Sequence, residues 1–257
     1  KPSLSIIGNP GTAVTVAIPG LSYSTVVNIP ATRLVVVNLP EAADLGDANN
    51  LIGKKGIRVT ATQPVAVHGL NKVKYTTDGY LGLPVVALGQ KYIIQAFGNL
   101  QTGVTDLNGS QFAIVGTESN TVVTITPSST TSGHPAGVPY TITLQAGDTY
   151  QLRNTNDAPA DLSGSRISAD KRVAVFGGHQ CANVASKTIW FCDYLVEQIL
   201  PVETWGMTFL TVPLATRAGD TFRILASVNG TKVYVNGFHV ATLNAGASHE
   251  MILAAAS

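Results

Sequence analysis

The chain has 257 residues, only 12% of them charged, and its 16 Lys and Arg against 15 Asp and Glu give a formal net charge of +1. So balanced a charge does not draw a protein onto nucleic acid or anionic lipid, and neither is an expected partner. No segment approaches the roughly 18 consecutive apolar residues of a spanning helix, so membrane insertion is not expected either.

The predicted secondary structure is β throughout. Apolar residues alternate with period two or form short β-branched runs that end at Gly, Pro, Asn or Asp, which is typical of strands. Asn-Gly turns join several of them, as at Asn229-Gly230 and Asn236-Gly237. The one segment predicted as a short helix is Asp193 to Ile199. The clearest predicted strands are residues 13–18, 33–37, 92–94, 112–115, 121–125, 140–144, 149–152, 222–225 and 232–235.

Internal repetition is the most informative pattern. Gly56-Ile-Arg-Val-Thr-Ala61, followed by Val65-Ala-Val67, recurs as Gly164-Ser-Arg-Ile-Ser-Ala169, followed by Val173-Ala-Val175, at a constant offset of 108 residues. A fixed offset indicates an architecture of recurring units. Further matches link Leu83-Pro-Val85 to Leu200-Pro-Val202, Gly89-Gln-Lys-Tyr92 to Gly206-Met-Thr-Phe209, Gly109-Ser-Gln-Phe112 to Gly219-Asp-Thr-Phe222, Thr121-Val-Val-Thr124 to Thr231-Lys-Val-Tyr234, and Leu144-Gln-Ala-Gly147 to Leu243-Asn-Ala-Gly246.

These matches predict antiparallel β-sandwich units of about 110 residues, because a sandwich needs about seven short strands. Residues 1–82 would form the later part of a first unit and residues 83–197 a complete second unit. Residues 198–257 would form the early part of a third unit, packed with the first. The alternative is a β-propeller, in which the two ends of the chain complete one blade.

The two cysteines, Cys181 and Cys192, lie eleven residues apart. We interpret them as a disulfide, which would place the protein in an oxidising compartment. The alternative is a pair of buried free thiols. Zinc binding is a weaker interpretation, because two sulfurs and the nearby His179 fall short of four ligands.

Several stretches resemble the N-terminal IgGFc-binding domain family, which also occurs in bacterial surface proteins. The most specific run from Asp161-Leu-Ser-Gly-Ser-Arg166 through Asp170-Lys-Arg-Val-Ala-Val-Phe-Gly-Gly-His-Gln-Cys181 to Cys192-Asp-Tyr-Leu-Val-Glu-Gln198. Arg172 replaces the proline that commonly precedes Val-Ala-Val, whereas Pro64 keeps it. The resemblance implies a secreted or cell-surface protein with an adhesive or ligand-binding role. It does not imply that this chain binds immunoglobulin, and it assigns no ligand residue.

A dense polar and aromatic cluster surrounds the cysteines. Its candidate ligand-binding residues are His179, Gln180, Trp190, Asp193 and Tyr194, since aromatic anchors beside polar groups suit recognition of a protein or glycan. The structural alternative is a disulfide-linked segment that covers an open end of the sheets, with Trp190 in the core and Asp193 capping the short helix.

Asp193 and Glu197, four residues apart, would share a helix face and could act as a hydrolytic pair on glycans. Asp78, the counterpart of Asp193 in the preceding repeat, lacks such a partner, which favours a structural role for both aspartates. No catalytic motif accompanies them, so we do not expect an enzyme.

No cofactor is expected, and calcium is the alternative. Its oxygen ligands would come from polar loop residues, although their spacing does not follow a calcium-binding loop and Asn and Asp are common in turns. These residues are Asp106, Asn108, Asn154, Asn156, Asp157 and Asp161.

The sequence therefore predicts an extracellular adhesion or recognition module that binds a cell-surface protein or glycan without catalysis. The first alternative is a structural spacer in a surface fibre, and the second is the hydrolase built on Asp193 and Glu197. A homo-oligomer is compatible with either of the first two functions, and it would be a trimer at a fibre tip.

Overall fold

The computed structural model describes residues 2–73, 76–103, 108–184, 188, 191–216 and 218–254. Within these ranges all regular structure is antiparallel strand except four short 3₁₀ turns: η1 (Pro19–Leu21), η2 (Glu41–Ala43), η3 (Val85–Ala87) and η4 (Val202–Thr204). The all-β prediction is confirmed. No helix in the described ranges is long and apolar enough to cross a membrane.

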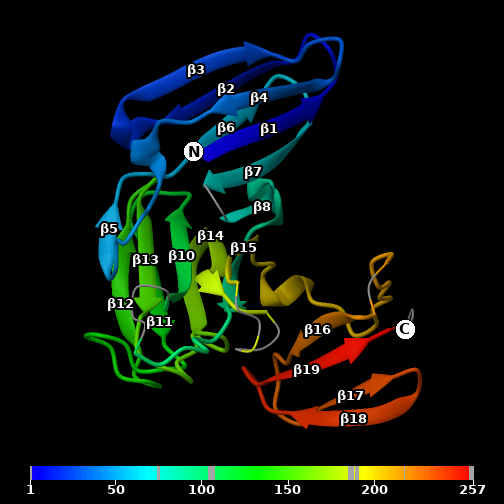
Figure 1. The fold of residues 1–257 in the computed structure, drawn as a ribbon. Helices are drawn as coiled ribbons and strands as arrows, with labels where there is room; N and C mark the ends of the chain where they lie inside the picture. The colour runs from blue at the N-terminus through cyan, green and yellow to red at the C-terminus, as the bar shows by residue number, and fades with distance from the viewer. Residues whose placement is uncertain are drawn as a thin grey trace.

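A seven-stranded sandwich, the first sandwich, forms the N-terminal part of the protein (Figure 1). Side chains from both sheets alternate between a shared core and solvent, as Ala13–Ile18 does with every second residue buried. One sheet has the order β4-β1-β7-β8 and the other β3-β2-β6. The strands are β1 (Pro2–Gly8), β2 (Ala13–Ile18), β3 (Tyr23–Asn28), β4 (Leu34–Asn38), β6 (Arg58–Ala61), β7 (Val65–Val73) and β8 (Thr76–Gly82).

The middle of the chain forms a second layered unit, the central sandwich, around one long strand. β14 (Arg166–Ala182) has 17 residues. Its first part pairs with β11 on one edge and β9 on the other, and its second part pairs with β10 and β15. The remaining path is β12-β11-β14-β10-β13-β5. These strands are β5 (Leu51–Gly53), β9 (Gly89–Ile93), β10 (Ser110–Gly116), β11 (Thr121–Thr126), β12 (Tyr140–Leu144), β13 (Thr149–Asn154) and β15 (Asp193–Gln198).

Because β14 runs through both layers of the central sandwich, its side chains contribute to the core that lies between the layers. Ile167, from its first part, and Val173 and Val175, from its second part, are buried in one cluster with Phe112 and Ile114 of β10. The prediction of sandwiches is thus supported over the propeller, since the described strands form sheets of four, three, eight, two and two strands rather than blades of four around an axis.

The last described strands form two hairpin-like pairs, β16 (Asp220–Leu225) with β19 (Ser248–Leu253), and β17 (Thr231–Val235) with β18 (Phe238–Leu243). Arg223 of β16 joins them to the central sandwich: its guanidinium donates to the Ala96 carbonyl at 2.9 Å and lies 4.6 Å from the Phe97 ring centroid. The unit boundaries at 82 and 197, the 110-residue unit length and the packing of the last unit with the first stay predictions.

The predicted helix at residues 193–199 is wrong, because this segment forms strand β15. The second part of β14 offers an open edge there, and β15 pairs along it from Phe176 opposite Gln198 to His179 opposite Leu195. Long-range backbone pairing therefore overrides the local pattern.

β14 and β15 approach so closely that glycine is required at one point. A Cβ atom on Gly178 would collide with the carbonyl oxygen of Leu195 in β15. We expect Gly178→Ala to destabilise the protein by roughly 1–3 kcal/mol, as overpacking does, measured by chemical denaturation. Gly206→Ala is the matched control, since its Cβ would meet nothing nearer than the Phe209 ring at 3.4 Å. Equal stability of the two variants would contradict this account.

Candidate functional site

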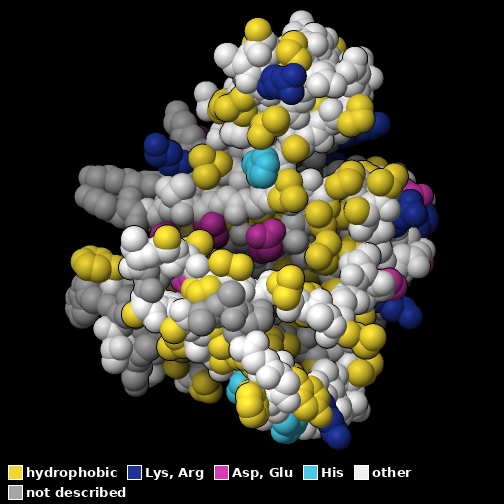
Figure 2. All heavy atoms as spheres, turned by 90° about the vertical axis from the view of Figure 1, so that its right-hand side faces the viewer, with side chains coloured by type: hydrophobic (Ala, Val, Ile, Leu, Met, Phe, Trp, Pro, Cys, Tyr) yellow, Lys and Arg dark blue, Asp and Glu magenta, His cyan; other side chains and the backbone are white. Residues whose placement is uncertain are grey.

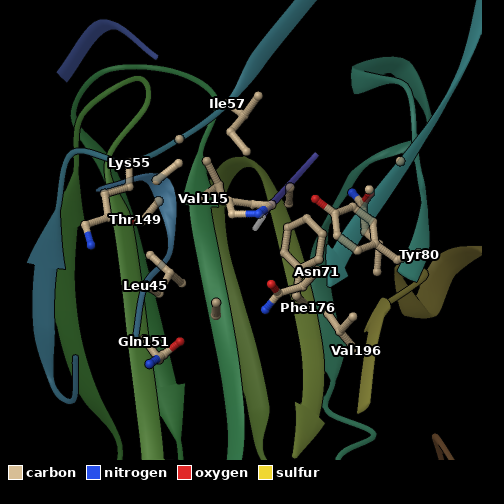
Figure 3. Close-up of a pocket in the computed structure, with 18 of the residues that line it drawn as sticks. Leu45, Lys55, Ile57, Asn71, Tyr80, Val115, Thr149, Gln151, Phe176 and Val196 are labelled. Carbon is tan, nitrogen blue, oxygen red and sulfur yellow. The ribbon is translucent and has the colours of Figure 1, made fainter. Parts of the chain in front are cut away.

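A cavity of about 1010 Å³ lies between the first sandwich and the outer face of the central sheet. We call it the inter-sandwich cavity. In Figure 3, Lys55, Leu45, Thr149 and Gln151 lie on one side of it, and Tyr80, Phe176 and Val196 lie on the other. Its volume is at the upper end of the range for ligand sites in proteins, and it lies between two structural units, a common place for such sites.

The strand alternation of the central sheet explains the hollow. On β10, Phe112 and Ile114 point into the central core, so Ala113 and Val115 face the cavity. On β14, Ala174 does the same with a small side chain. Small residues on the outward face of two adjacent strands therefore leave room that larger side chains would fill.

One wall of the cavity is aromatic. Tyr80 of β8 and Phe176 of β14 meet edge to face, with ring centroids 5.0 Å apart. The Tyr80 ring lies across the backbone of Gly69, where any Cβ would collide with it. Tyr194 of β15 lies beside them in the same lining. This wall joins the first sandwich to the central sandwich by apolar contact.

The aromatic hydroxyls in this wall stay neutral over the physiological range. Burial raises the pKa of the Tyr80 phenol. The pKa of Tyr194 is raised to about 12, mainly by burial and next by the negative charge of the nearby Asp44. Both groups therefore act as hydrogen-bonding phenols rather than as bases.

The opposite wall is polar and held by a short loop. The Gln151 side-chain amide donates to the carbonyls of Gly46 at 3.0 Å and Ala48 at 2.6 Å. The Arg153 guanidinium donates to Asp47 at 2.7 Å and also to the side-chain oxygen of Gln180. Both Gln151 and Arg153 are buried although they sit on the outer face of the sheet. The loop of residues 44–49 thus closes over this side.

Unpaired polar atoms gather in this lining. Among the described residues, three buried side-chain atoms lack a hydrogen-bond partner: Asn71 Oδ1, Thr149 Oγ1 and Arg153 Nε. All three belong to residues that line the inter-sandwich cavity. An unpaired buried polar atom costs about 1–3 kcal/mol. Figure 3 shows Asn71 and Thr149 on opposite sides of the cavity, so these costs fall on both of its walls.

His179, a predicted ligand residue, is buried below the disulfide and fully engaged. Its Nε2 donates to Asn99 Oδ1 at 2.8 Å, and its Nδ1 accepts the Cys181 amide at 2.9 Å. Asn99, with no exposed surface, also accepts the amides of Gly109 and Ser110. Burial, which disfavours the charged imidazolium, lowers the pKa of His179 to about 4 and outweighs the opposing attraction of Asp161. The geometry gives His179 a structural role.

The structure distributes the other predicted ligand residues over different places. Gln180 and Tyr194 line the cavity, and Asp193 lies at the β8–β15 junction. The predicted disulfide between Cys181 and Cys192 is confirmed, with Cα atoms 5.0 Å apart. Trp190 lies outside the described residues.

The carboxylates near β15 bridge the two sandwiches. Asp193 accepts hydrogen bonds from the Thr76 hydroxyl and the Thr77 amide of β8, and Asp78 of β8 accepts the Val196 amide at 2.8 Å. Gln198 accepts the Leu83 amide at 2.8 Å. Asp78 and Asp193 therefore both bind backbone amides of the neighbouring strand.

The hydrolytic pair does not form as the sequence suggested. In a strand, residues four apart lie about 13 Å from each other along the chain. In a helix the same two residues would be separated by only about one turn. Asp193 is already bound by Thr76 and Thr77. Burial raises the pKa of the Glu197 carboxyl, with a further contribution from Asp78.

The side-chain NH₂ groups of the asparagines considered as calcium ligands donate to backbone carbonyls. Asn154 donates to Thr130 at 3.1 Å, and Asn156 donates to the same carbonyl at 3.0 Å. Asn108 donates to Gln101 and Asn156. The described part of the chain contains no cluster of three His, Cys, Asp or Glu side chains suited to a metal ion, and Asp106 lies outside it.

Sequence reasoning missed Tyr80, Phe176, Gln151 and Arg153. Outward positions in alternating strands ordinarily face solvent, and the docking of the first sandwich makes these residues part of the cavity lining. One usable signal was Phe176, a large aromatic residue at an outward position beside two glycines.

The buried His179 predicts a loss of stability in acid. The unfolded histidine binds a proton below about pH 6.5, whereas the folded one binds it only near pH 4. The unfolded state therefore binds more protons between these values, and stability falls by up to about 3 kcal/mol as pH falls through this window. We expect His179→Gln to flatten this part of the profile, measured by denaturation at several pH values. His68→Gln is the matched substitution at an exposed histidine, and an unaltered slope in His179→Gln would refute the assignment.

Comparison with known proteins now identifies the family. The family model described as IgGFc binding protein matches residues 78–257, from β8 onward. Over 206 residues the chain is 29% identical to the IgGFc-binding protein of Homo sapiens, an alignment that covers 79% of this chain and 4% of that protein. No solved structure matches the chain. Because the model covers more than half of its length, the chain belongs to the IgGFc binding protein family.

Proposed function

We propose that this chain is an extracellular recognition module that binds a protein partner in the inter-sandwich cavity. The observation that carries the proposal is the large cavity between the two sandwiches, which combines an aromatic wall, Tyr80 with Phe176, and a wall of polar side chains. Family membership supports the coarser statement, an extracellular binding role. The disulfide is consistent with an oxidising compartment.

The cavity chemistry favours a peptide segment or loop. Amide side chains such as Gln111 and Gln198 line it beside apolar residues, and its basic residues are offset by acidic ones. An extended peptide presents apolar side chains and backbone groups together, and such a mixed lining suits both. A strongly anionic ligand such as a phosphate would need an excess of positive charge instead.

The first partner to test is the Fc region of immunoglobulin G. The name of the human relative states that it binds IgG Fc, but this chain spans only 4% of that protein, so the partner is a proposal here. Glycans are the second ligand class to test, because aromatic and amide side chains also suit sugars. Adhesion would follow if the bound ligand is displayed on a cell surface.

A spacer role is the second candidate function. One observation favours it: the order β4-β1-β7-β8 in the first sandwich corresponds to β13-β10-β14-β15 in the central sandwich, in the same chain order. Units that repeat in this way can form a long array without binding a ligand.

Filling the cavity separates these functions. We expect Ala174→Phe to fill the hollow between β10 and β14 and to abolish binding of Fc or glycan while the melting temperature stays within a few degrees. Val122→Phe adds the same group at an exposed site on β11 and should bind like the parent. Binding is measured by biolayer interferometry against Fc fragments and by a glycan array.

Two other outcomes would point to the disulfide-linked segment or to the spacer role. If Ala174→Phe still binds but the double variant Cys181→Ser with Cys192→Ser does not, the site is the disulfide-linked segment rather than the cavity. If the folded parent binds neither Fc nor any glycan on the array, the recognition proposal is abandoned in favour of the spacer.

A further inference from the structure

The buried arginine of the polar wall lies at a position where the fold needs no charged residue. In the register of the sheets, Arg153 of β13 corresponds to Asn38 of β4 in the first sandwich and to Ile252 of β19 in the last strands. Asn38 is exposed and Ile252 is 69% exposed, whereas Arg153 is 6% exposed. A strand in this position therefore folds with a neutral side chain, and a buried charge here has another role.

The guanidinium of Arg153 is incompletely paired. Its Nη1 donates to Asp47 at 2.7 Å, its Nη2 donates to the side-chain oxygen of Gln180, and its Nε is buried without a partner. The side chain of Asp47 is 90% exposed. The negative charge that pairs with this arginine thus remains in water, where an ion pair contributes little to stability.

The carboxylate of Asp47 is not required to hold its own loop. Gln151 donates to the backbone carbonyls on both sides of Asp47. The backbone amide of Arg153 also donates to Asn49 Oδ1 at 2.9 Å. The Asp47 carboxylate can therefore leave the guanidinium while the loop of residues 44–49 stays attached to β13.

The two ends of the cavity differ in charge. Arg153 contacts Gln180, which lies four residues beyond Phe176 on the same face of β14, or about 13 Å along the strand. Asp78 and Glu197 lie at the β8–β15 junction, beside the aromatic wall. Figure 2 shows acidic side chains at mid-height on this side of the molecule, below the first sandwich. A ligand carboxylate is therefore attracted to the arginine end and repelled from the aromatic end.

We propose that Arg153 binds a carboxylate group of the partner's bound segment in place of Asp47. An apolar side chain of the same segment, about four residues away, packs on the aromatic wall. This inference rests on the proposed function, because it names the chemistry that the inter-sandwich cavity recognises. Arginine suits a carboxylate since its planar donors match the two oxygens. Asp47 is then an internal substitute that occupies the guanidinium until the ligand arrives.

Capped peptides test this inference with the intact chain. The probes carry one Phe and one Glu separated by two to four alanines, and matched probes carry Gln in place of Glu. We expect the Glu peptides to bind at least about tenfold more tightly, since hydrogen bonds to charged groups are the stronger ones. A third set, with Gln and a free C-terminal carboxylate, separates an acidic side chain from a chain terminus as the source of the group. Affinities are measured by isothermal titration calorimetry.

Variants of the protein test the role of the arginine. Asp47→Asn removes the internal carboxylate, so the Glu peptides should bind several-fold more tightly while the Gln peptides are unaffected. Glu118→Gln is the matched control, because it removes the same charge from an exposed lining residue just beyond the end of β10, and it should leave both affinities unchanged. Arg153→Gln should abolish the preference for Glu peptides, with the melting temperature recorded for each variant.

Three outcomes would overturn the inference. If Glu and Gln peptides bind alike and Ala174→Phe abolishes both, the cavity is the binding site but Arg153 does not select the ligand. If Asp47→Asn lowers stability and does not strengthen binding of the Glu peptides, the ion pair serves only to hold the loop. If no peptide binds, the inference fails, and the Fc and glycan measurements decide the proposed function separately.

Discussion

The structure depends on the double pairing of β14. A strand of 17 residues supplies backbone donors and acceptors to four neighbours, two along its first part and two along its second. Unpaired backbone groups in the interior are costly, so the position of β14 fixes the positions of β9, β10, β11 and β15 together. The alternation of β14 then places Val173 and Val175 in the core and Ala174 and Phe176 on the opposite face. The core and the inter-sandwich cavity therefore lie on opposite faces of the same strand.

Much of the fold could be predicted from the sequence because it depends on local pattern. Period-two alternation and Asn-Gly turns identified the strands, and the recurring Val-Ala-Val segments correspond to β7 and β14 in the two sandwiches. The spacing of Cys181 and Cys192 suggested the disulfide that forms. The helix expected at Asp193 to Ile199 failed, since no local pattern records that β14 leaves an edge there for β15 to pair with.

The site was harder to predict because it arises from docking. Arg153 and Gln151 occupy outward positions that read as solvent-exposed, and only the loop of residues 44–49, roughly 100 residues earlier in the chain, buries them. His179 attracted attention as a polar residue beside a cysteine, whereas its two hydrogen bonds give it a structural role. Polar residues that support the scaffold and polar residues that face a cavity look alike in sequence, and only their partners distinguish them.

The disulfide would also limit the extension of the chain if the protein were placed under mechanical tension. It closes the connection between β14, which lies at the centre of its sheet, and β15 at the edge. If force separated these two strands, the bridge would keep the eleven-residue span from Cys181 to Cys192 from extending, about 35 Å of contour length. The central strand would meanwhile resist in shear along two ladders of hydrogen bonds at once. While the disulfide is intact, this span would therefore add no length to a chain under tension.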